Sequence, residues 1–145
     1  MRVIIQRVKK SDVKVQGEIV GAIDKGLLVL FAVHKDDTED KIKKMADKIL
    51  NLRIFSDSED KMNLSLLDVG GEILVVSQFT LYGDTKKGKR PSFVDSARPE
   101  KAIPMYENFV SYIREKRIKT ETGKFGEEME VGLVNDGPTT ILIDL

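Results

Sequence analysis

Three hydrogen-bonding side chains interrupt an apolar run in the middle of the chain. The stretch EILVVSQFTLYG (residues 72–83) begins like a buried strand, and Ser77, Gln78 and Thr80 then surround Phe79. Side chains alternate along a strand, so Gln78 and Thr80 are predicted to share one face, with Ser77 and Phe79 on the other. The pattern fits either the wall of a pocket or a strand that passes from the core to the solvent.

The chemistry open to this stretch is nucleophilic attack or stabilisation of an oxyanion. Thr80 carries a hydroxyl that could attack a carbonyl carbon, but such a nucleophile needs an activating base, and the sequence offers no obvious one. Backbone N–H groups are a second resource, because they can stabilise an oxyanion where a strand stops pairing. Ser77, Gln78, Phe79 and Thr80 are therefore the candidate catalytic residues.

A second unusual stretch, LVNDGPTTILIDL (residues 133–145), closes the sequence. The letters NDG between strand-like runs predict a hairpin, and Pro138, which has no N–H, interrupts the ladder after the turn. A trans proline is the ordinary expectation, since few X-Pro bonds are cis. A cis Gly137-Pro138 peptide would instead point two consecutive carbonyl oxygens in nearly the same direction, forming a rigid acceptor pair able to read a chiral centre.

A basic loop follows the polar strand end. The segment GDTKKGKRPSF (residues 83–93) contains Lys86, Lys87, Lys89 and Arg90. Cations beside a pocket can bind the phosphates of a nucleic acid. An ordinary solvated turn is the alternative, and the spacing alone slightly favours it.

Other kinds of site are excluded or unsupported. The chain has no Cys and a single His, His34, so thiolate chemistry and His-rich or Cys-based zinc sites are ruled out. His34 precedes a charged segment and is interpreted as a surface or helix-entry residue. No phosphate-binding loop or dinucleotide fingerprint is present. We expect neither a metal nor a cofactor.

The elements that must position these residues are mostly strands. The chain has 145 residues and equal numbers of basic and acidic residues, and no apolar stretch is long enough to span a membrane. We expect a single domain over residues 1–145, and we interpret the protein as cytoplasmic. Strands are predicted at residues 1–8, within 11–33 as three short strands, at 53–57, 72–79, 128–135 and 139–145.

Two segments have helical periodicity instead. Residues 36–52 place Ile42, Met45, Ile49 and Leu52 on one stripe, and residues 98–117 do the same with a second apolar set. Short connections and an excess of strands predict an α+β domain with a curved, mainly antiparallel sheet or small partial barrel and two helices.

The motifs taken together resemble those of the D-aminoacyl-tRNA deacylases. The resemblance rests on SQFTLYG, KGKRPSF, TGKFGEEMEV and NDGPTT, and it extends over the whole chain in order. It implies hydrolysis of the ester between a D-amino acid and the terminal adenosine of tRNA, with L-aminoacyl-tRNA rejected and mischarged glycyl-tRNA also accepted. It further implies a small β-barrel-like α+β fold, a homodimer and an active site at the dimer interface.

The resemblance also implies roles for single residues. Gly137 and Pro138 would match a Gly-cisPro element that reaches into the partner's pocket, and Arg7 would brace that element across the dimer. Phe125 and Met129 would hold the terminal adenine, facing the wall of residues 77–80.

Two questions are left open by the sequence. The key chemical group is either the hydroxyl of Thr80 or the 2′-hydroxyl of the RNA, and we favour the RNA. The alternative functions are a non-enzymatic nucleic-acid-binding β-domain, which would use the basic loop, and a general esterase that uses Thr80. The net charge of zero weighs against the nucleic-acid-binding module.

Overall fold

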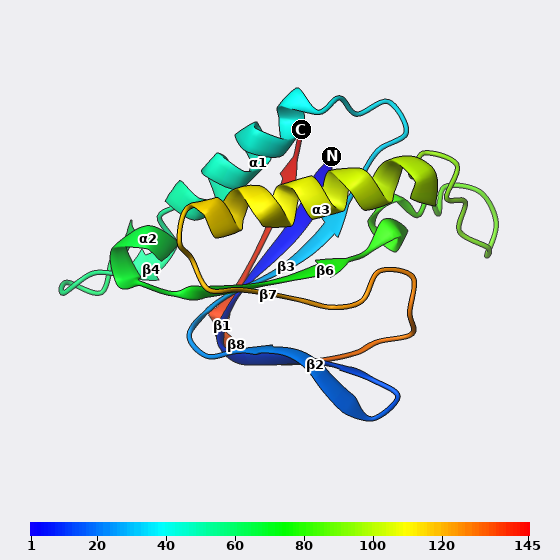
Figure 1. The fold of residues 1–145 in the computed structure, drawn as a ribbon. Coiled ribbons are helices and arrows are strands. Elements are labelled where there is room, and N and C mark those ends of the chain that lie inside the picture. The colour runs from blue at the N-terminus through cyan, green and yellow to red at the C-terminus, as the bar shows by residue number, and fades with distance from the viewer.

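Strand β1 (Arg2–Val15) is the centre of the sheet and is paired on both edges (Figure 1). It pairs antiparallel with β3 (Gly26–Ala32) along its first half and with β2 (Glu18–Ile23) along its second half, while β8 (Glu130–Asp144) follows its other edge. The structure is a computed structural model that describes residues 1–145. The prediction of separate strands before and after residue 10 was wrong, because pairing with β8 continues through that point.

Two more strands extend the sheet in parallel. β6 (Glu72–Ser77) lies beside β3, and β7 (Thr120–Thr122) lies beside β6. The sheet is thus mixed, but its antiparallel pairings outnumber the parallel ones, which confirms the predicted mainly antiparallel arrangement. A separate two-stranded sheet joins β4 (Phe55–Ser56) to β5 (Met62–Leu64).

The sheet curls until β2 approaches β7, so that the barrel is nearly closed. Gly21 makes this approach possible. A Cβ atom added there would lie 2.5 Å from the backbone oxygen of Thr122, closer than any real side chain tolerates. The curl forms a small apolar core inside the barrel, in which Val13, Leu28 and Leu74 are fully buried.

Helices α1 (Asp40–Asn51) and α3 (Pro99–Glu115) lie across one face of the sheet (Figure 1). The predicted stripes are buried at Ile42, Met45 and Ile113. Besides these two predicted helices, the chain forms a one-turn helix, α2 (Leu66–Val69), and a 3-10 turn, η1 (Phe79–Tyr82). The α+β, barrel-like fold class is confirmed.

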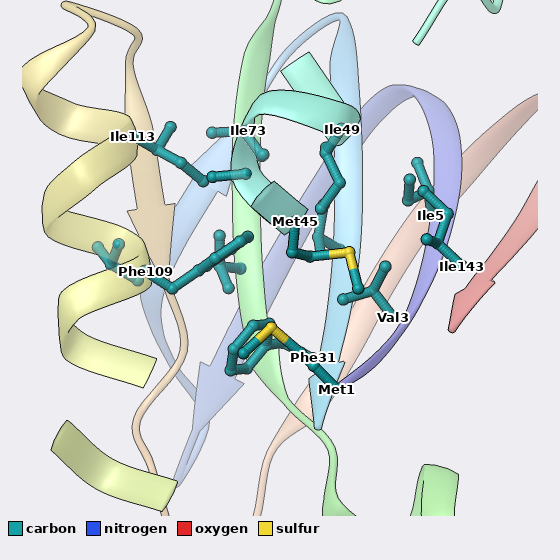
Figure 2. Close-up of a cluster of buried hydrophobic side chains, with 14 of the residues drawn as sticks. Met1, Val3, Ile5, Phe31, Met45, Ile49, Ile73, Phe109, Ile113 and Ile143 are labelled. Carbon is teal, nitrogen blue, oxygen red and sulfur yellow. The ribbon is translucent and has the colours of Figure 1, made fainter. Parts of the chain in front are cut away.

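The main core lies between the two long helices and the sheet. Figure 2 shows Phe109 and Ile113 of α3 meeting Met45 and Ile49 of α1 over the strands. Phe31 of β3 packs against Phe109 with ring centroids 4.5 Å apart. Each such large side chain contributes about 1.5–3 kcal/mol by its burial, so this layer fixes the sheet that carries the candidate site.

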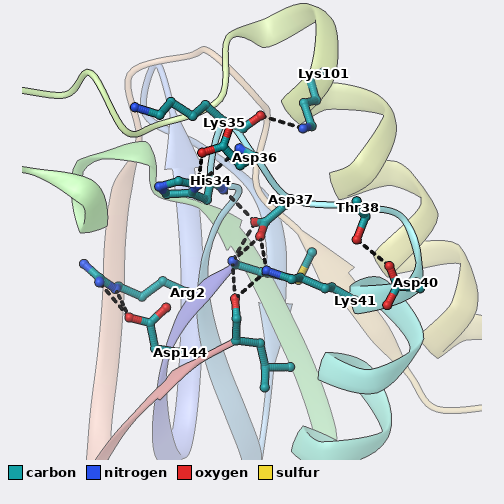
Figure 3. Close-up of polar contacts among 12 residues, drawn as sticks. Arg2, His34, Lys35, Asp36, Asp37, Thr38, Asp40, Lys41, Lys101 and Asp144 are labelled. Carbon is teal, nitrogen blue, oxygen red and sulfur yellow. Dashed lines mark hydrogen bonds and ion pairs between the residues drawn. The ribbon is translucent and has the colours of Figure 1, made fainter.

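Asp37 is a buried polar centre where the chain ends meet (Figure 3). Its carboxylate accepts hydrogen bonds from the Met1 ammonium at 2.7 Å, from Lys41 at 2.8 Å and from the backbone N–H of His34 at 2.7 Å. Burial alone would raise the pKa of Asp37, but the bonds from Lys41 and Met1 outweigh it and hold the pKa below its usual range. Helix α1 begins after Glu39 without a side-chain cap.

Candidate active site

The polar end of β6 leaves the sheet sooner than the sequence predicted. The N–H of Gln78 donates to the carbonyl of Phe31 at 2.8 Å, and the chain then turns into η1 (Phe79–Tyr82). The predicted strand alternation through residues 77–80 was therefore wrong, although the side chains of Gln78 and Thr80 do lie together and are joined by a hydrogen bond. A 3-10 turn does not alternate its side chains as a strand does.

This turn leaves backbone donors available. The N–H of Leu81 bonds to the carbonyl of Gln78 at 3.1 Å, which closes the turn. The first N–H groups of a helical turn have no partner within it, and here these belong to Phe79 and Thr80. Such donors are suited to an oxyanion.

Thr80 has no base to activate it. Its side chain is exposed, and its hydroxyl oxygen accepts a hydrogen bond from the side-chain amide of Gln78. An amide N–H cannot take the hydroxyl's proton. His34 does not supply this base, because its ring packs edge-on against Tyr82 and lies outside the pocket that Gln78 lines.

A pocket of about 660 Å³ opens at the end of β6. Ser77, Gln78 and Phe79 form one part of its wall, and Phe125 and Met129, from the loop that precedes β8, form another. The structure thus brings together five of the residues predicted from the sequence, while Thr80 lies outside the lining. Most of the lining is hydrophobic, which suits a ligand with a flat or apolar part.

Several lining residues were missed by the sequence reasoning. They come from the end of β3, from the loop after η1 and from the start of α3, where no motif marks them: Phe31, Ala32, Val33, Phe93, Ser96, Ala97, Arg98, Pro99, Ala102 and Tyr106. The one exception is Phe93, which ends the motif KGKRPSF and could have been found from it.

The ionisable groups of the lining supply little acid–base chemistry. Tyr106 donates its hydroxyl to the carbonyl of Val75 at 2.8 Å, and burial raises its pKa above the usual value, so it stays neutral. Glu127 is the one carboxylate of the lining and is exposed to solvent, as is Arg98. The pocket therefore offers hydrogen-bond donors and apolar surface more than a general base.

The closing motif is not a hairpin. β8 runs without interruption from Glu130 to Asp144, and its pairing with β1 shifts register around Val8. The predicted hairpin at NDG was wrong, because pairing with β1 on both sides of the motif overrides the local turn signal. The Gly137-Pro138 peptide is cis, and both residues are exposed.

This irregular segment of β8 is nevertheless tightly held. The Asn135 side chain accepts a hydrogen bond from the N–H of Thr139 at 2.7 Å and donates to the Thr140 hydroxyl at 3.1 Å. Gly137 has a φ of +138°, and a Cβ there would lie 2.6 Å from the Thr139 hydroxyl. Glycine is thus required at this position by both backbone and space.

Arg7 supports the segment around Gly137 and Pro138 through hydrogen bonds. Its guanidinium is buried, donates to the carbonyl of Asp136 at 3.0 Å and also donates to the carbonyl of Ile54. We expected Arg7 to brace the motif of a partner, but in this structure it braces the motif of its own chain. Neither Arg7 nor the Gly137-Pro138 pair lines the pocket of this chain.

The basic loop lies beside the pocket, and its basic side chains form no ion pairs. Asp84 and Ser92 bond to each other through their backbones at 2.8 and 2.9 Å and close the loop between them. Lys86, Lys87, Lys89 and Arg90 are exposed and form no ion pair. None of the four lines the pocket itself.

No group of three or more His, Cys, Asp or Glu residues is arranged to hold a metal ion. None of the helices is both long enough and apolar enough to span a membrane.

Comparison with known proteins places this geometry in a family. A protein named D-aminoacyl-tRNA deacylase from Thermosipho africanus is 58% identical over 144 residues, covering 99% of this chain and 97% of that protein. The protein of the same name from Brevibacillus brevis is 55% identical, covering 99% of each chain.

Solved structures show the same fold. The c-Myc DNA Unwinding Element Binding Protein superposes with a TM-score of 0.94 at 38% identity and covers 100% of this chain and 99% of its own. A probable eukaryotic D-amino acid tRNA deacylase superposes with a TM-score of 0.85 at 20% identity, covering 99% and 98%, and this likeness concerns the fold alone. The D-Tyr-tRNA(Tyr) deacylase family pattern matches residues 4–144, and the chain therefore belongs to that family.

Proposed function

We propose that the protein hydrolyses the ester bond of D-aminoacyl-tRNA and of glycyl-tRNA, and so removes wrongly charged tRNA before translation. The observation that carries this proposal is the full-length family match, together with the pocket at the end of β6. Because tRNA is charged in the cytoplasm, the enzyme is expected to act there.

The pocket suits the end of an aminoacyl-tRNA. Phe125 and Met129 offer an apolar wall for the terminal adenine, and Phe125 is fixed against Tyr106 with ring centroids 5.8 Å apart. The unpaired cations of the 86–90 loop are available for the phosphates. Binding of this kind needs no cofactor and no metal.

The reaction that fits these groups is direct hydrolysis. Water adds to the ester carbonyl, the N–H groups of Phe79 and Thr80 stabilise the oxyanion, and the ester oxygen leaves as the hydroxyl of the terminal ribose. The neighbouring 2′-hydroxyl of that ribose assists the proton transfers. Thr80 is not the nucleophile in this scheme, because no group accepts its proton.

We further propose that the active enzyme is a homodimer in which each chain completes the pocket of the other. The segment around Gly137 and Pro138 is exposed and firmly held, and these two residues do not line the pocket of their own chain. β8 also has one unpaired edge, with Leu133 and Leu142 exposed by 37% and 60%. Such an edge favours pairing with another chain.

In the dimer, the carbonyls of Gly137 and Pro138 would capture the α-amino group of the substrate. They would leave no room for the side chain of an L-amino acid. Rejection of the wrong enantiomer, rather than extra affinity for the D form, would then give the selectivity. Glycine has no side chain to reject, so glycyl-tRNA is accepted.

The test is hydrolysis of D-Tyr-tRNA and L-Tyr-tRNA side by side at low nanomolar enzyme. We expect rapid loss of the D ester while the L ester persists. Loss of both esters at one rate would refute the chiral selection and indicate an unselective esterase. If neither ester is lost, the deacylase proposal fails.

A second candidate is a nucleic-acid-binding domain without turnover. The basic loop and the name of the DNA-binding neighbour favour it. Titration with uncharged tRNA and with single-stranded DNA separates the two candidates. Tight binding to either, without ester hydrolysis, would favour the binding domain.

A further inference from the structure

Two aromatic rings are exposed at the mouth of the pocket. Phe79 is 55% exposed and Phe93 is 36% exposed, and their rings meet edge to face with centroids 5.1 Å apart. The fold does not need either ring for its core, since both lie outside the two buried clusters. Large aromatic side chains left in solvent as a pair indicate a surface that binds something.

The pair is held in a fixed arrangement. Phe93 packs on the bare backbone of Gly83, where an added Cβ atom would lie 3.1 Å from the ring. The bridge between Asp84 and Ser92 closes the loop directly before Phe93, and η1 fixes Phe79. A rigid edge-to-face pair keeps ring surface open to a third flat group.

The surroundings of the pair are cationic. The four cations at residues 86–90, which form no ion pair, lie shortly before Phe93 in the chain. Exposed Arg98, which lies 3.8 Å from the carboxylate of Glu100, lines the same pocket. Aromatic rings beside cations form the usual surface for single-stranded nucleic acid, in which bases stack and phosphates are neutralised.

We propose that Phe79 and Phe93 form a stacking platform for the base of the nucleotide that precedes the terminal adenosine. This rests on the proposed function, which places the terminal adenosine inside the pocket that both rings line. The 3′ end of tRNA is unpaired, so its penultimate base is free to leave the pocket mouth and lie on the rings. The platform thus distinguishes an aminoacyl-RNA from an aminoacyl-nucleoside.

The test compares two substrates. D-Tyr-tRNA contains the penultimate nucleotide, and the D-tyrosyl ester of adenosine does not. We expect Phe93→Leu, which keeps apolar bulk without an aromatic face, to lower the ratio of kcat/KM for the tRNA to kcat/KM for the adenosine ester by about tenfold. Phe93→Tyr should keep the ratio. Val94→Ala is the matched control, because Val94 is 73% exposed, is next in the chain and does not line the pocket.

A second measurement does not depend on turnover. An uncharged oligonucleotide ending in the tRNA 3′ sequence, with 2-aminopurine in place of the penultimate base, should lose fluorescence when it binds, and Phe93→Leu should abolish that loss. Two results would overturn the proposal: an unchanged ratio, which includes an equal loss on both substrates, or a changed oligomeric state of Phe93→Leu in gel filtration. If the unmodified protein hydrolyses neither ester, the proposed function has failed instead, and the fluorescence result still decides whether the base stacks.

Discussion

Replacement of Thr80 by Ala tests whether the protein or the RNA supplies the chemistry. The Thr80 hydroxyl is exposed and takes part in one hydrogen bond, which it accepts from Gln78. A hydrogen bond of this kind contributes about 0.5–1.5 kcal/mol, and about 1.4 kcal/mol corresponds to a factor of ten in rate. Thr80→Ala should therefore lower kcat/KM by about tenfold or less.

A nucleophile would behave very differently. Removal of the nucleophilic serine of a protease lowers kcat by about a millionfold. The assay is single-turnover hydrolysis of D-Tyr-tRNA, with circular dichroism as a control for folding. The companion substrate is D-Tyr-tRNA that ends in 2′-deoxyadenosine, for which we expect the unmodified enzyme to lose at least about a hundredfold in rate. A loss of more than about a thousandfold in folded Thr80→Ala, with full activity on the deoxy substrate, would refute the reasoning.

Three further predictions concern the groups around the site. Arg7→Ala should lower the free energy of unfolding by about 3 kcal/mol in a urea titration, because it leaves the carbonyls of Asp136 and Ile54 unpaired, and it should also abolish deacylation. Asp37→Asn should lower the free energy of unfolding by a similar amount, about 3 kcal/mol, since it removes one partner of a buried ion pair. The pKa of Asp37 is lowered in the folded state, so its contribution is present above about pH 4 and is lost as the pH falls further; the variant should unfold with a weaker pH dependence below pH 4. Joint replacement of Lys87 and Lys89 by Gln should raise KM for D-Tyr-tRNA and leave kcat unchanged. The slope of log KM against log salt concentration should fall by about two.

The two long helices were predicted well, because the spacing of apolar residues within each segment is enough to indicate a helix. The stripe through Ile42 and Met45 has helical spacing, and burying it against the sheet satisfies the same residues that the pattern selects. The wall of the pocket was partly predictable for a similar reason. Ser77 and Gln78 interrupt an apolar strand, and a buried strand accepts polar side chains only near its end.

Other features depend on contacts between distant segments, which no local pattern contains. The turn signal at NDG was overridden by pairing between β8 and β1, and the strand alternation expected through residues 77–80 was ended by the 3-10 turn. Likewise, Tyr106 reaches the pocket only because α3 packs on the sheet. The motif resemblance supplied the family, whereas the positions of Arg7 and of the basic loop relative to the pocket needed the structure.

The pairing of the first strand with the last has a consequence for biosynthesis. Arg2 and Asp144 bind each other across 142 residues of chain, so one whole edge of β1 stays open until β8 has been made. Contacts of such long range slow folding, and an open strand edge attracts other chains. The nascent protein must therefore keep its most central strand from aggregating until β8 has been made, and the native sheet forms only after β8 has left the ribosome.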